Sequence, residues 1–122
     1  MAVVTGASSG IGAATVVGLG RAGYKIAAGA RRLERVRRVV GESGIALPLD
    51  VTRLESIDAF IAEVKNKFGR IDVLVNNAGL ARGLAPIAEG KDEDWIEMWE
   101  ANVLGLLRMT RASLPLIRKA RH

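Results

Sequence analysis

Short apolar runs and helical apolar stripes alternate along this chain of 122 residues. The runs are continuous, which is typical of strands that are buried on both faces of a sheet. They predict strands over residues 2–4, 25–30, 45–49 and 71–75. Apolar positions that recur at steps of three and four residues predict helices over 11–22, 33–40, 54–68 and 95–114. The pattern therefore predicts strands and helices in regular alternation.

This alternation decides the fold class. Helices of this length can cross from one parallel strand to the next, so the sheet is expected to be parallel and covered on both faces. We therefore predict an α/β fold, a Rossmann-type doubly wound parallel sheet with about four strands. In such sheets ligands bind at the carboxyl ends of the strands, where the strand order reverses. Arg31, Asp50, Asn77 and a glycine-rich turn all follow predicted strands, so we expect them to meet there.

Local signals mark the ends of the helices. The segment Thr52-Arg53-Leu54-Glu55 has the pattern of a capping box and predicts a helix start, and Gly69 predicts the end of that helix. Pro115 is expected to kink or end the last helix near Leu114. Asn102 lies within the apolar stripe of the last helix, where its side chain needs hydrogen-bond partners, either in the fold or in a site.

The most specific signal is the glycine-rich turn Thr5-Gly6-Ala7-Ser8-Ser9-Gly10-Ile11-Gly12, which follows the first predicted strand. A strand, glycines and a helix start bring backbone N–H groups onto a phosphate, because glycine has no Cβ to hold the ligand away. No Lys-Ser or Lys-Thr pair follows, which excludes a Walker-type loop. The spacing also departs from G-x-G-x-x-G/A, because Thr15 stands in the third position. The turn favours nucleotide binding.

The same stretch also has to be weighed as a membrane segment. The first 20 residues carry no charge and contain Gly6-x-x-x-Gly10, a pattern of packed membrane helices. Nine of these 20 residues are Gly, Ser or Thr, which is too polar for a hydrocarbon core. A secretory signal begins with positive residues, whereas the first one here is Arg21. We therefore expect no membrane partner, and the absence of a targeting signal favours the cytoplasm.

Charge and residue types narrow the partners further. The formal net charge is +5, with five arginines in positions 31–38 and a second basic cluster of Arg118, Lys119, Arg121 and His122. Neither cluster contains the aromatic residues on which bases stack, so we interpret both as solvated helix faces or helix ends and expect no nucleic acid. The chain has no cysteine and one histidine, so no metal site of the usual kind is expected.

Four motifs follow one another in a recognisable order. They are the turn from Thr5 to Gly12, Asp50-Val51, Asn76-Asn77-Ala78-Gly79, and Asn102 on a long helix. In this order they resemble the short-chain dehydrogenase/reductase family, and the resemblance covers essentially the whole chain. It implies an oxidoreductase that interconverts a small-molecule carbonyl and an alcohol by hydride transfer at a nicotinamide cofactor. It also implies a homo-oligomer in the complete protein, paired through the helix of Trp95.

The resemblance implies roles for individual residues. The loop around the pyrophosphate and ribose would be formed by Gly6, Ser8, Ser9, Gly10, Ile11 and Gly12. Asp50 would accept a hydrogen bond from the adenine amino group, with Val51 beside it. The cofactor would also be lined by Asn77, Ala78 and Gly79. As the catalytic-site residue of this half, Asn102 would hold a water that links the family's catalytic lysine to solvent.

Charge predicts which cofactor is preferred. Enzymes that select NAD place an acid near the end of the second strand to bind the ribose 2′-OH. Here Ala30 stands in that place, and Arg31 and Arg32 follow it. Arginine hydrogen bonds to a 2′-phosphate contribute about 1.5 to 3 kcal/mol each, so NADP(H) is the predicted cofactor. Arg31 is expected to be the main contact, because Arg32 is alternatively the start of the next helix.

The family's proton donor is missing from this sequence. That donor is a tyrosine activated by a lysine four residues later, whereas Tyr24 is the only tyrosine here and Ala28 stands four residues after it. The family's catalytic serine follows a fifth strand. We therefore expect residues 1–122 to be the cofactor-binding half of a longer enzyme, truncated before the fifth strand and inactive alone. A noncatalytic dinucleotide-binding or partner-interaction module is the alternative.

A half-fold would leave two apolar surfaces uncovered. The strand at 71–75 would form a sheet edge, and the helix of Trp95 and Trp99 would lose its cover. Such surfaces promote pairing with other chains. The isolated residues are therefore expected to associate or to be poorly soluble.

Overall fold

A computed structural model of the chain describes residues 1–120, so Arg121 and His122 of the second basic cluster lie outside the described residues. The strands are β1 (Ala2–Thr5), β2 (Ile26–Ala30), β3 (Gly44–Pro48) and β4 (Val73–Val75). The helices are α1 (Gly10–Arg21), α2 (Leu33–Val40), α3 (Leu54–Phe68), α4 (Asp92–Trp99) and α5 (Gly105–Ile117). Single 3₁₀ turns lie at Gly41–Ser43 and Ile87–Glu89, and a π-helical turn, Glu100–Leu104, joins α4 to α5.

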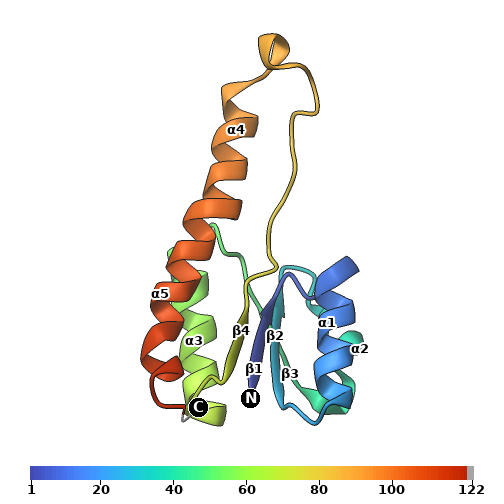
Figure 1. The fold of residues 1–122 in the computed structure, drawn as a ribbon, viewed down its shortest axis with the longest axis vertical. Helices are drawn as coiled ribbons and strands as arrows, with labels where there is room; N and C mark the ends of the chain where they lie inside the picture. The colour runs from blue at the N-terminus through green and yellow to red at the C-terminus, as the bar shows by residue number, and fades with distance from the viewer. Residues whose placement is uncertain (121–122) are drawn as a thin grey trace.

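The strands form one parallel sheet in the order β3-β2-β1-β4. The chain builds outward from β1 to β3 and then adds β4 on the other side of β1, so the strand order reverses between β1 and β4. Figure 1 shows α1 and α2 against one face of the sheet, and α3 and α5 against the other. The predicted doubly wound parallel sheet with helices on both faces is confirmed.

Two apolar clusters, one on each face, hold the helices on the sheet. Val3 of β1 belongs to the cluster that contains Phe60 of α3. Val4, the next residue, belongs to the cluster that contains Val16 of α1. Successive side chains of a strand point to opposite faces, so both must be apolar when both faces are covered. This is why the strands read as continuous apolar runs.

The predicted capping box at the start of α3 is wrong. The N-cap residue is Arg53, and it makes no side-chain capping hydrogen bond. The hydroxyl of Thr52 donates to Oδ1 of Asp50 at 2.6 Å, and Glu55 accepts from the Arg53 guanidinium at 2.8 Å. The carboxylate of Asp50, two residues earlier, accepts from both the N–H and the hydroxyl of Thr52, which holds this side chain in the turn before the helix. Gly69 ends α3 with a left-handed φ of 74°, as predicted.

The last predicted helix is one continuous helical column in which a π-helical turn, wider than an α-helical turn, lies between two α-helices. Figure 1 shows α4 running through the π-helical turn into α5. Of the two effects expected of Pro115, the helix end near Leu114 is wrong, because α5 continues through Pro115 to Ile117. Pro115 lies in the last turn of α5, where its missing N–H removes one intrahelical hydrogen bond and little of the helix remains to be disrupted.

Two surfaces of the described chain lack cover. β4 is an edge strand of the sheet. The helical column carries an exposed apolar surface, here named the α4–α5 face, whose members are Trp95, Ile96, Trp99, Leu106, Leu107 and Leu114. No helix within residues 1–120 is both long enough and apolar enough to cross a bilayer.

Candidate functional site

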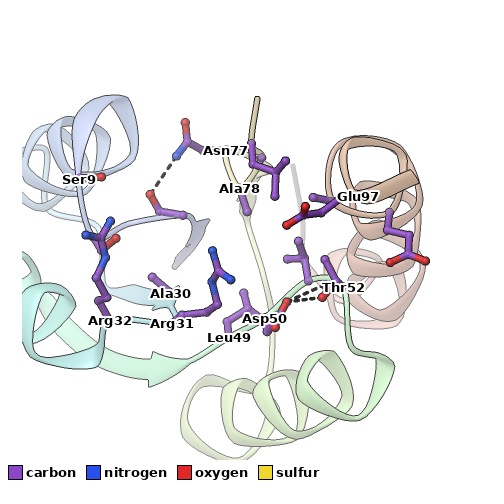
Figure 2. Close-up of a pocket in the computed structure, with 17 residues that line it drawn as sticks. Ser9, Ala30, Arg31, Arg32, Leu49, Asp50, Thr52, Asn77, Ala78 and Glu97 are labelled. Carbon is purple, nitrogen blue, oxygen red and sulfur yellow. Dashed lines mark hydrogen bonds between the residues drawn. The ribbon is translucent and has the colours of Figure 1, made fainter. Parts of the chain in front are cut away.

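A cavity of about 710 Å³ lies at the carboxyl ends of the strands (Figure 2). Its walls are the turn after β1, the residues that follow β2, β3 and β4, and one side of α4 and the π-helical turn. This volume falls within the range of about 300 to 1,000 Å³ that is usual for small-molecule sites. Segments that are remote in the sequence therefore meet where the strand order reverses.

Most of the predicted site residues line this cavity. They are Gly6, Ser8, Ser9, Arg31, Arg32, Asp50, Val51, Asn77, Ala78 and Gly79. Outside the wall are Gly10, Ile11, Gly12 and Asn102. The first three begin α1, and Asn102 lies in the π-helical turn next to Gly79. Three of the four predicted residues outside the wall therefore lie at the start of α1, and the fourth lies beside the wall residue Gly79.

The glycine turn is closed by a hydrogen bond that only glycines allow. Gly6 has a left-handed φ of 63°, and a Cβ there would lie 2.9 Å from Cα of Ala78. The Asn77 side chain donates from Nδ2 to the Gly6 carbonyl at 3.0 Å, which ties the end of β4 to the turn after β1. A Cβ on Gly12 would collide with both the Gly6 carbonyl and Nδ2 of Asn77. The two glycines thus permit the close approach of α1, the turn and the β4 loop.

The start of α1 is suited to an anion. Ser9 is the N-cap residue of α1, lines the cavity and makes no side-chain capping hydrogen bond. Gly10 begins the helix with a left-handed φ of 59°, and the side chain of Ile11 is exposed. The N–H groups of a first helical turn need acceptors and carry partial positive charge. A phosphate at this position would satisfy both requirements.

Thr5 organises the site although the sequence did not single it out as a site residue. Its side chain is buried at the end of β1, and its Oγ1 accepts hydrogen bonds from the N–H groups of Asn77 at 3.0 Å and Ala78 at 2.9 Å. The same hydroxyl donates to the carbonyl of Val75 at 3.4 Å. Thr5 therefore sets the path of the chain as it leaves β4. A polar residue at the end of a fully apolar strand was the signal available in the sequence.

Asp50 is held as an acceptor. Its Oδ1 accepts from the Thr52 N–H at 3.0 Å and from the Thr52 hydroxyl at 2.6 Å, and its own N–H donates to Oγ of Ser56 at 2.8 Å. Partial burial acts to raise the pKa of Asp50. The Thr52 hydrogen bonds and the charges of Arg31 and Arg53 outweigh burial, so this pKa lies below its ordinary value. Asp50 is therefore a carboxylate at neutral pH.

Two arginines occupy the wall after β2. Ala30 is buried at the end of the strand, whereas Arg31 and Arg32 are exposed and line the cavity. Figure 2 shows the Arg31 side chain between Ala30 and Asp50, and the Arg32 side chain reaching toward Ser9. Arg32 is also the N-cap residue of α2, so starting the helix and lining the cavity are not exclusive. The two guanidinium groups make this side of the cavity attractive to a phosphate.

Asn102 is satisfied by the fold. Its side-chain amide forms hydrogen bonds with the backbone of Leu80, the residue after the wall residue Gly79. Of the two alternatives that the sequence left open, the structure therefore shows a structural partner for this side chain. Asn76 is bonded similarly, since its Nδ2 donates to Oγ1 of Thr110 on α5 at 3.0 Å.

Other wall residues were not predicted as site residues. They are Ala30, Leu49, Thr52, Leu80, Glu97, Glu100 and Ala101. Glu97, Glu100 and Ala101 follow at steps of three and four, which places them on one side of the helical column. The sequence contains this spacing, but only the fold shows that this side covers the cavity. Within residues 1–120, no three Asp, Glu, His or Cys side chains are grouped so that they could hold a metal ion.

Comparison with known proteins settles the family. The family model described as short chain dehydrogenase matches residues 1–122. The chain belongs to the short-chain dehydrogenase family. This is an oxidoreductase family, and the predicted resemblance is therefore confirmed.

The relatives of this short-chain dehydrogenase chain are longer. It is 42% identical over 121 residues to an uncharacterised oxidoreductase of Staphylococcus saprophyticus, covering 96% of this chain and 49% of that protein. It is 40% identical over 122 residues to the NADP-dependent 3-hydroxy acid dehydrogenase of Schizosaccharomyces pombe, covering 93% and 47%. The structure of an alcohol dehydrogenase from the archaeon Thermococcus sibiricus, complexed with 5-hydroxy-NADP, matches with a TM-score of 0.92 and 38% identity, covering 97% and 53%. The chain spans about half the length of these relatives.

Proposed function

We propose that residues 1–122 form the NADP(H)-binding half of a short-chain dehydrogenase that interconverts a carbonyl and an alcohol by hydride transfer. The observation that carries the proposal is the cavity itself, which joins a glycine turn and a helix N-terminus to Arg31 and Arg32. The relative from Schizosaccharomyces pombe is named as NADP-dependent, and the structure from Thermococcus sibiricus is a complex with 5-hydroxy-NADP. Both support the same cofactor class for this chain.

The donors and acceptors of the wall fit the parts of a dinucleotide. The pyrophosphate and its ribose would be held by Gly6, Ser8, Ser9 and the first turn of α1, which includes Gly10, Ile11 and Gly12. The Asp50 carboxylate would accept from the adenine amino group, with Val51 beside the base. The loop of Asn77, Ala78 and Gly79 would line the cofactor on the β4 side.

The preference for NADP(H) follows from the residues after β2. Ala30 offers no carboxylate to a ribose 2′-OH, and the guanidinium groups of Arg31 and Arg32 would form charge-assisted hydrogen bonds with a 2′-phosphate. Each such bond strengthens binding by roughly tenfold or more. NADH would lack these bonds, so it would bind more weakly.

The 122 residues would bind the cofactor without completing the reaction. The bound cofactor would supply the hydride, but a carbonyl also needs a proton donor. Tyr24 precedes β2, so it lies at the amino ends of the strands, where it lines a second cavity with Lys25 and Arg70. The first cavity is at the opposite ends of the strands. The proton donor would therefore be supplied by further residues, and Asn102 would serve as a positioning residue.

Titration of the 122-residue chain with NADPH and with NADH, followed by cofactor fluorescence, tests this proposal. We expect NADPH to bind at least about tenfold more tightly. Equal or tighter binding of NADH would contradict the cofactor preference, and no binding of either would contradict the site. Turnover by this chain with NADPH and a panel of carbonyls would contradict the prediction that it lacks a proton donor.

A noncatalytic module that acts through partner contacts is the second candidate, and the exposed α4–α5 face would serve it as it would serve an enzyme that pairs its subunits. This face and the β4 edge would pair the chain with a second subunit or another partner. A monomer in sedimentation would argue against both kinds of association. The coding sequence beyond the codon for residue 122 would distinguish the two candidates. A serine after a further strand, followed by Tyr-x-x-x-Lys, would identify the enzyme.

A further inference from the structure

The loop that follows β4 is held from two sides. On the sheet side, Thr5 accepts from the N–H groups of Asn77 and Ala78, which both line the cavity. On the other side, the helical column reaches the loop through α5, where Oγ1 of Thr110 accepts from Nδ2 of Asn76 at 3.0 Å. The residue that is bonded to α5 therefore directly precedes the wall residues. Figure 2 shows the next side chain, that of Asn77, turned toward the turn after β1.

The Thr110 hydroxyl acts toward Asn76 as an acceptor. Its proton is donated to the carbonyl of Leu106, one helical turn earlier, at 2.8 Å. A hydroxyl has one O–H donor and two acceptor lone pairs, so its lone pairs remain for the Asn76 amide. The hydroxyl therefore fixes the orientation of the Asn76 side chain, which must turn its NH₂ group, rather than its oxygen, toward α5.

A second contact joins α5 to the chain at the other end of β4. The N–H of Ile71 donates to the carbonyl of Leu116 at 3.1 Å, and both residues are buried. This contact is made by the backbone, so it does not depend on the side chain of Thr110. Loss of the Thr110 hydroxyl would therefore free the carboxyl end of β4, where the wall begins, and leave the amino end docked on α5.

We propose that Thr110 is a positioning residue for the cofactor, because it holds Asn76 and thereby sets the path of the wall residues Asn77, Ala78 and Gly79. This inference rests on the proposed function, in which these three residues line NADP(H). Thr110 lies outside the cavity wall, so it would act on the cofactor through the loop and not by contact. Without its acceptor, the Asn76 amide would turn in search of another partner and would carry the following N–H groups out of line with Thr5.

Two substitutions of Thr110 separate positioning from packing. Thr110→Val keeps the size of the side chain and removes the acceptor, whereas Thr110→Ser keeps the hydroxyl and removes a methyl group. Thr15→Val is the matched control, because Thr15 of α1 also donates to the carbonyl one turn earlier, that of Ile11 at 2.7 Å, and lies outside the cavity wall. Far-UV circular dichroism establishes that each variant is folded.

NADPH is titrated into each variant, and amide hydrogen exchange of residues 76–80 is measured in the cofactor-free chain. We expect Thr110→Val to weaken NADPH binding by about fivefold to tenfold and to speed exchange at Asn77 and Ala78 by a similar factor. Thr110→Ser should bind NADPH as the wild type does, although it packs less well. Thr15→Val should leave both quantities unchanged.

A double-mutant cycle tests whether Thr110 acts through Asn76. Once Asn76→Ala has removed the donor, adding Thr110→Val should weaken NADPH binding by less than about twofold more. Losses that multiply in the double variant would mean that Thr110 acts by another route, and would overturn the proposal.

The remaining outcomes separate the inference from the proposed function. Tight NADPH binding that is equal in wild type and Thr110→Val overturns the role of Thr110 and leaves the NADP(H) site standing. Equal losses of affinity in Thr110→Ser and Thr110→Val indicate an effect of packing and also overturn that role. Failure of the wild-type chain to bind NADPH overturns both.

Discussion

The side-chain amide of Asn102 forms a two-point contact with the backbone of Leu80. Nδ2 donates to the Leu80 carbonyl at 2.8 Å, and Oδ1 accepts from the Leu80 N–H at 2.8 Å. The preceding residue, Gly79, packs against the same side chain, since a Cβ there would lie 2.7 Å from Oδ1. The contact fixes the loop after β4 against the π-helical turn, so this asparagine helps to hold one wall of the cavity in place.

Replacement of Asn102 should therefore loosen this wall. Asn102→Ala removes both hydrogen bonds, and we expect it to lower the free energy of unfolding by about 1 to 3 kcal/mol and to weaken NADPH binding. Asn102→Asp keeps the acceptor but loses the donor, so its effect should be similar in direction. Urea denaturation and NADPH titration measure the two quantities. Asn66→Ala, on an exposed position of α3, is the control, and equal effects of both alanine variants would contradict this role.

A pair of glycines in α1 offers a sharper comparison. Gly12→Ala places a methyl group against the Gly6 carbonyl and Nδ2 of Asn77, so the 3.0 Å hydrogen bond between them must break or shift. We expect a loss of about 1 to 3 kcal/mol in stability and a loss of cofactor binding. Gly18→Ala meets nothing within 4 Å and should stabilise the helix by about 0.5 to 1 kcal/mol. Thermal unfolding of both variants should therefore shift in opposite directions.

Thr5 provides a test of a buried hydroxyl. Thr5→Val keeps the shape but leaves the partly buried N–H groups of Asn77 and Ala78 without their acceptor, at a total cost of about 1 to 3 kcal/mol. Thr5→Ser keeps the hydroxyl and should restore most of the stability. Thr15→Val removes an exposed hydroxyl that bonds only to the Ile11 carbonyl and should change little. A Thr5→Val variant as stable as Thr15→Val would show that Thr5 does not hold the β4 loop.

The fold could be predicted because its determinants are local in the sequence. The run Val3-Val4 is apolar at both positions because each residue packs into a different layer, and this alone distinguishes a doubly covered sheet. Gly69 was a reliable signal for the end of α3, because ending the helix requires only its left-handed conformation and no contact with a distant residue. Thr52 was misread for the opposite reason. Its hydroxyl donates to the carboxylate of Asp50, which holds the side chain in the turn before α3, and the capping-box pattern does not include this partner.

The site was less predictable where it depends on packing between elements. The motif residues lie directly after strands, so the parallel sheet brings them together without further information. The π-helical turn leaves no such signal in the sequence. Gly105, the residue after it, packs so closely against Val51 that a Cβ there would lie 2.9 Å from the Val51 carbonyl, and the sequence does not show this contact. Glu97 enters the wall only because the helical column crosses the carboxyl edge of the sheet. Its spacing alone fits any exposed helix.

The arginines after β2 should control cofactor choice. We expect Arg31→Ala to weaken NADPH binding by about tenfold to a hundredfold while NADH binding changes only a few-fold, because only NADPH carries the 2′-phosphate. Arg32→Ala should act in the same direction. Arg38→Ala removes an equal charge from the exposed part of α2, outside the cavity wall, and should affect both cofactors little. Equal losses of affinity for NADPH and NADH in Arg31→Ala would show that Arg31 contacts a part common to both cofactors rather than the 2′-phosphate.

The lowered pKa of Asp50 makes its contribution to stability dependent on pH. The pKa is below the ordinary value of 3.8 in the folded chain, so the ionised carboxylate stabilises the fold above that value. This stabilisation is lost as the pH falls through the lower folded-state pKa. Asp72 also has a lowered pKa, but Asp50 does not contribute to it, so Asp72 titrates alike in wild type and in Asp50→Asn and cancels in the difference. The pKa of Glu55 is lowered by hydrogen bonds while the charge of Asp50 acts to raise it, so Asp50→Asn lowers the pKa of Glu55 further, a smaller change at an exposed group. That difference in the free energy of unfolding should be largest near about pH 7 and shrink below about pH 3. Urea denaturation at both pH values measures it. A difference that stays constant with pH would mean that Asp50 acts through its shape and hydrogen bonds rather than its charge.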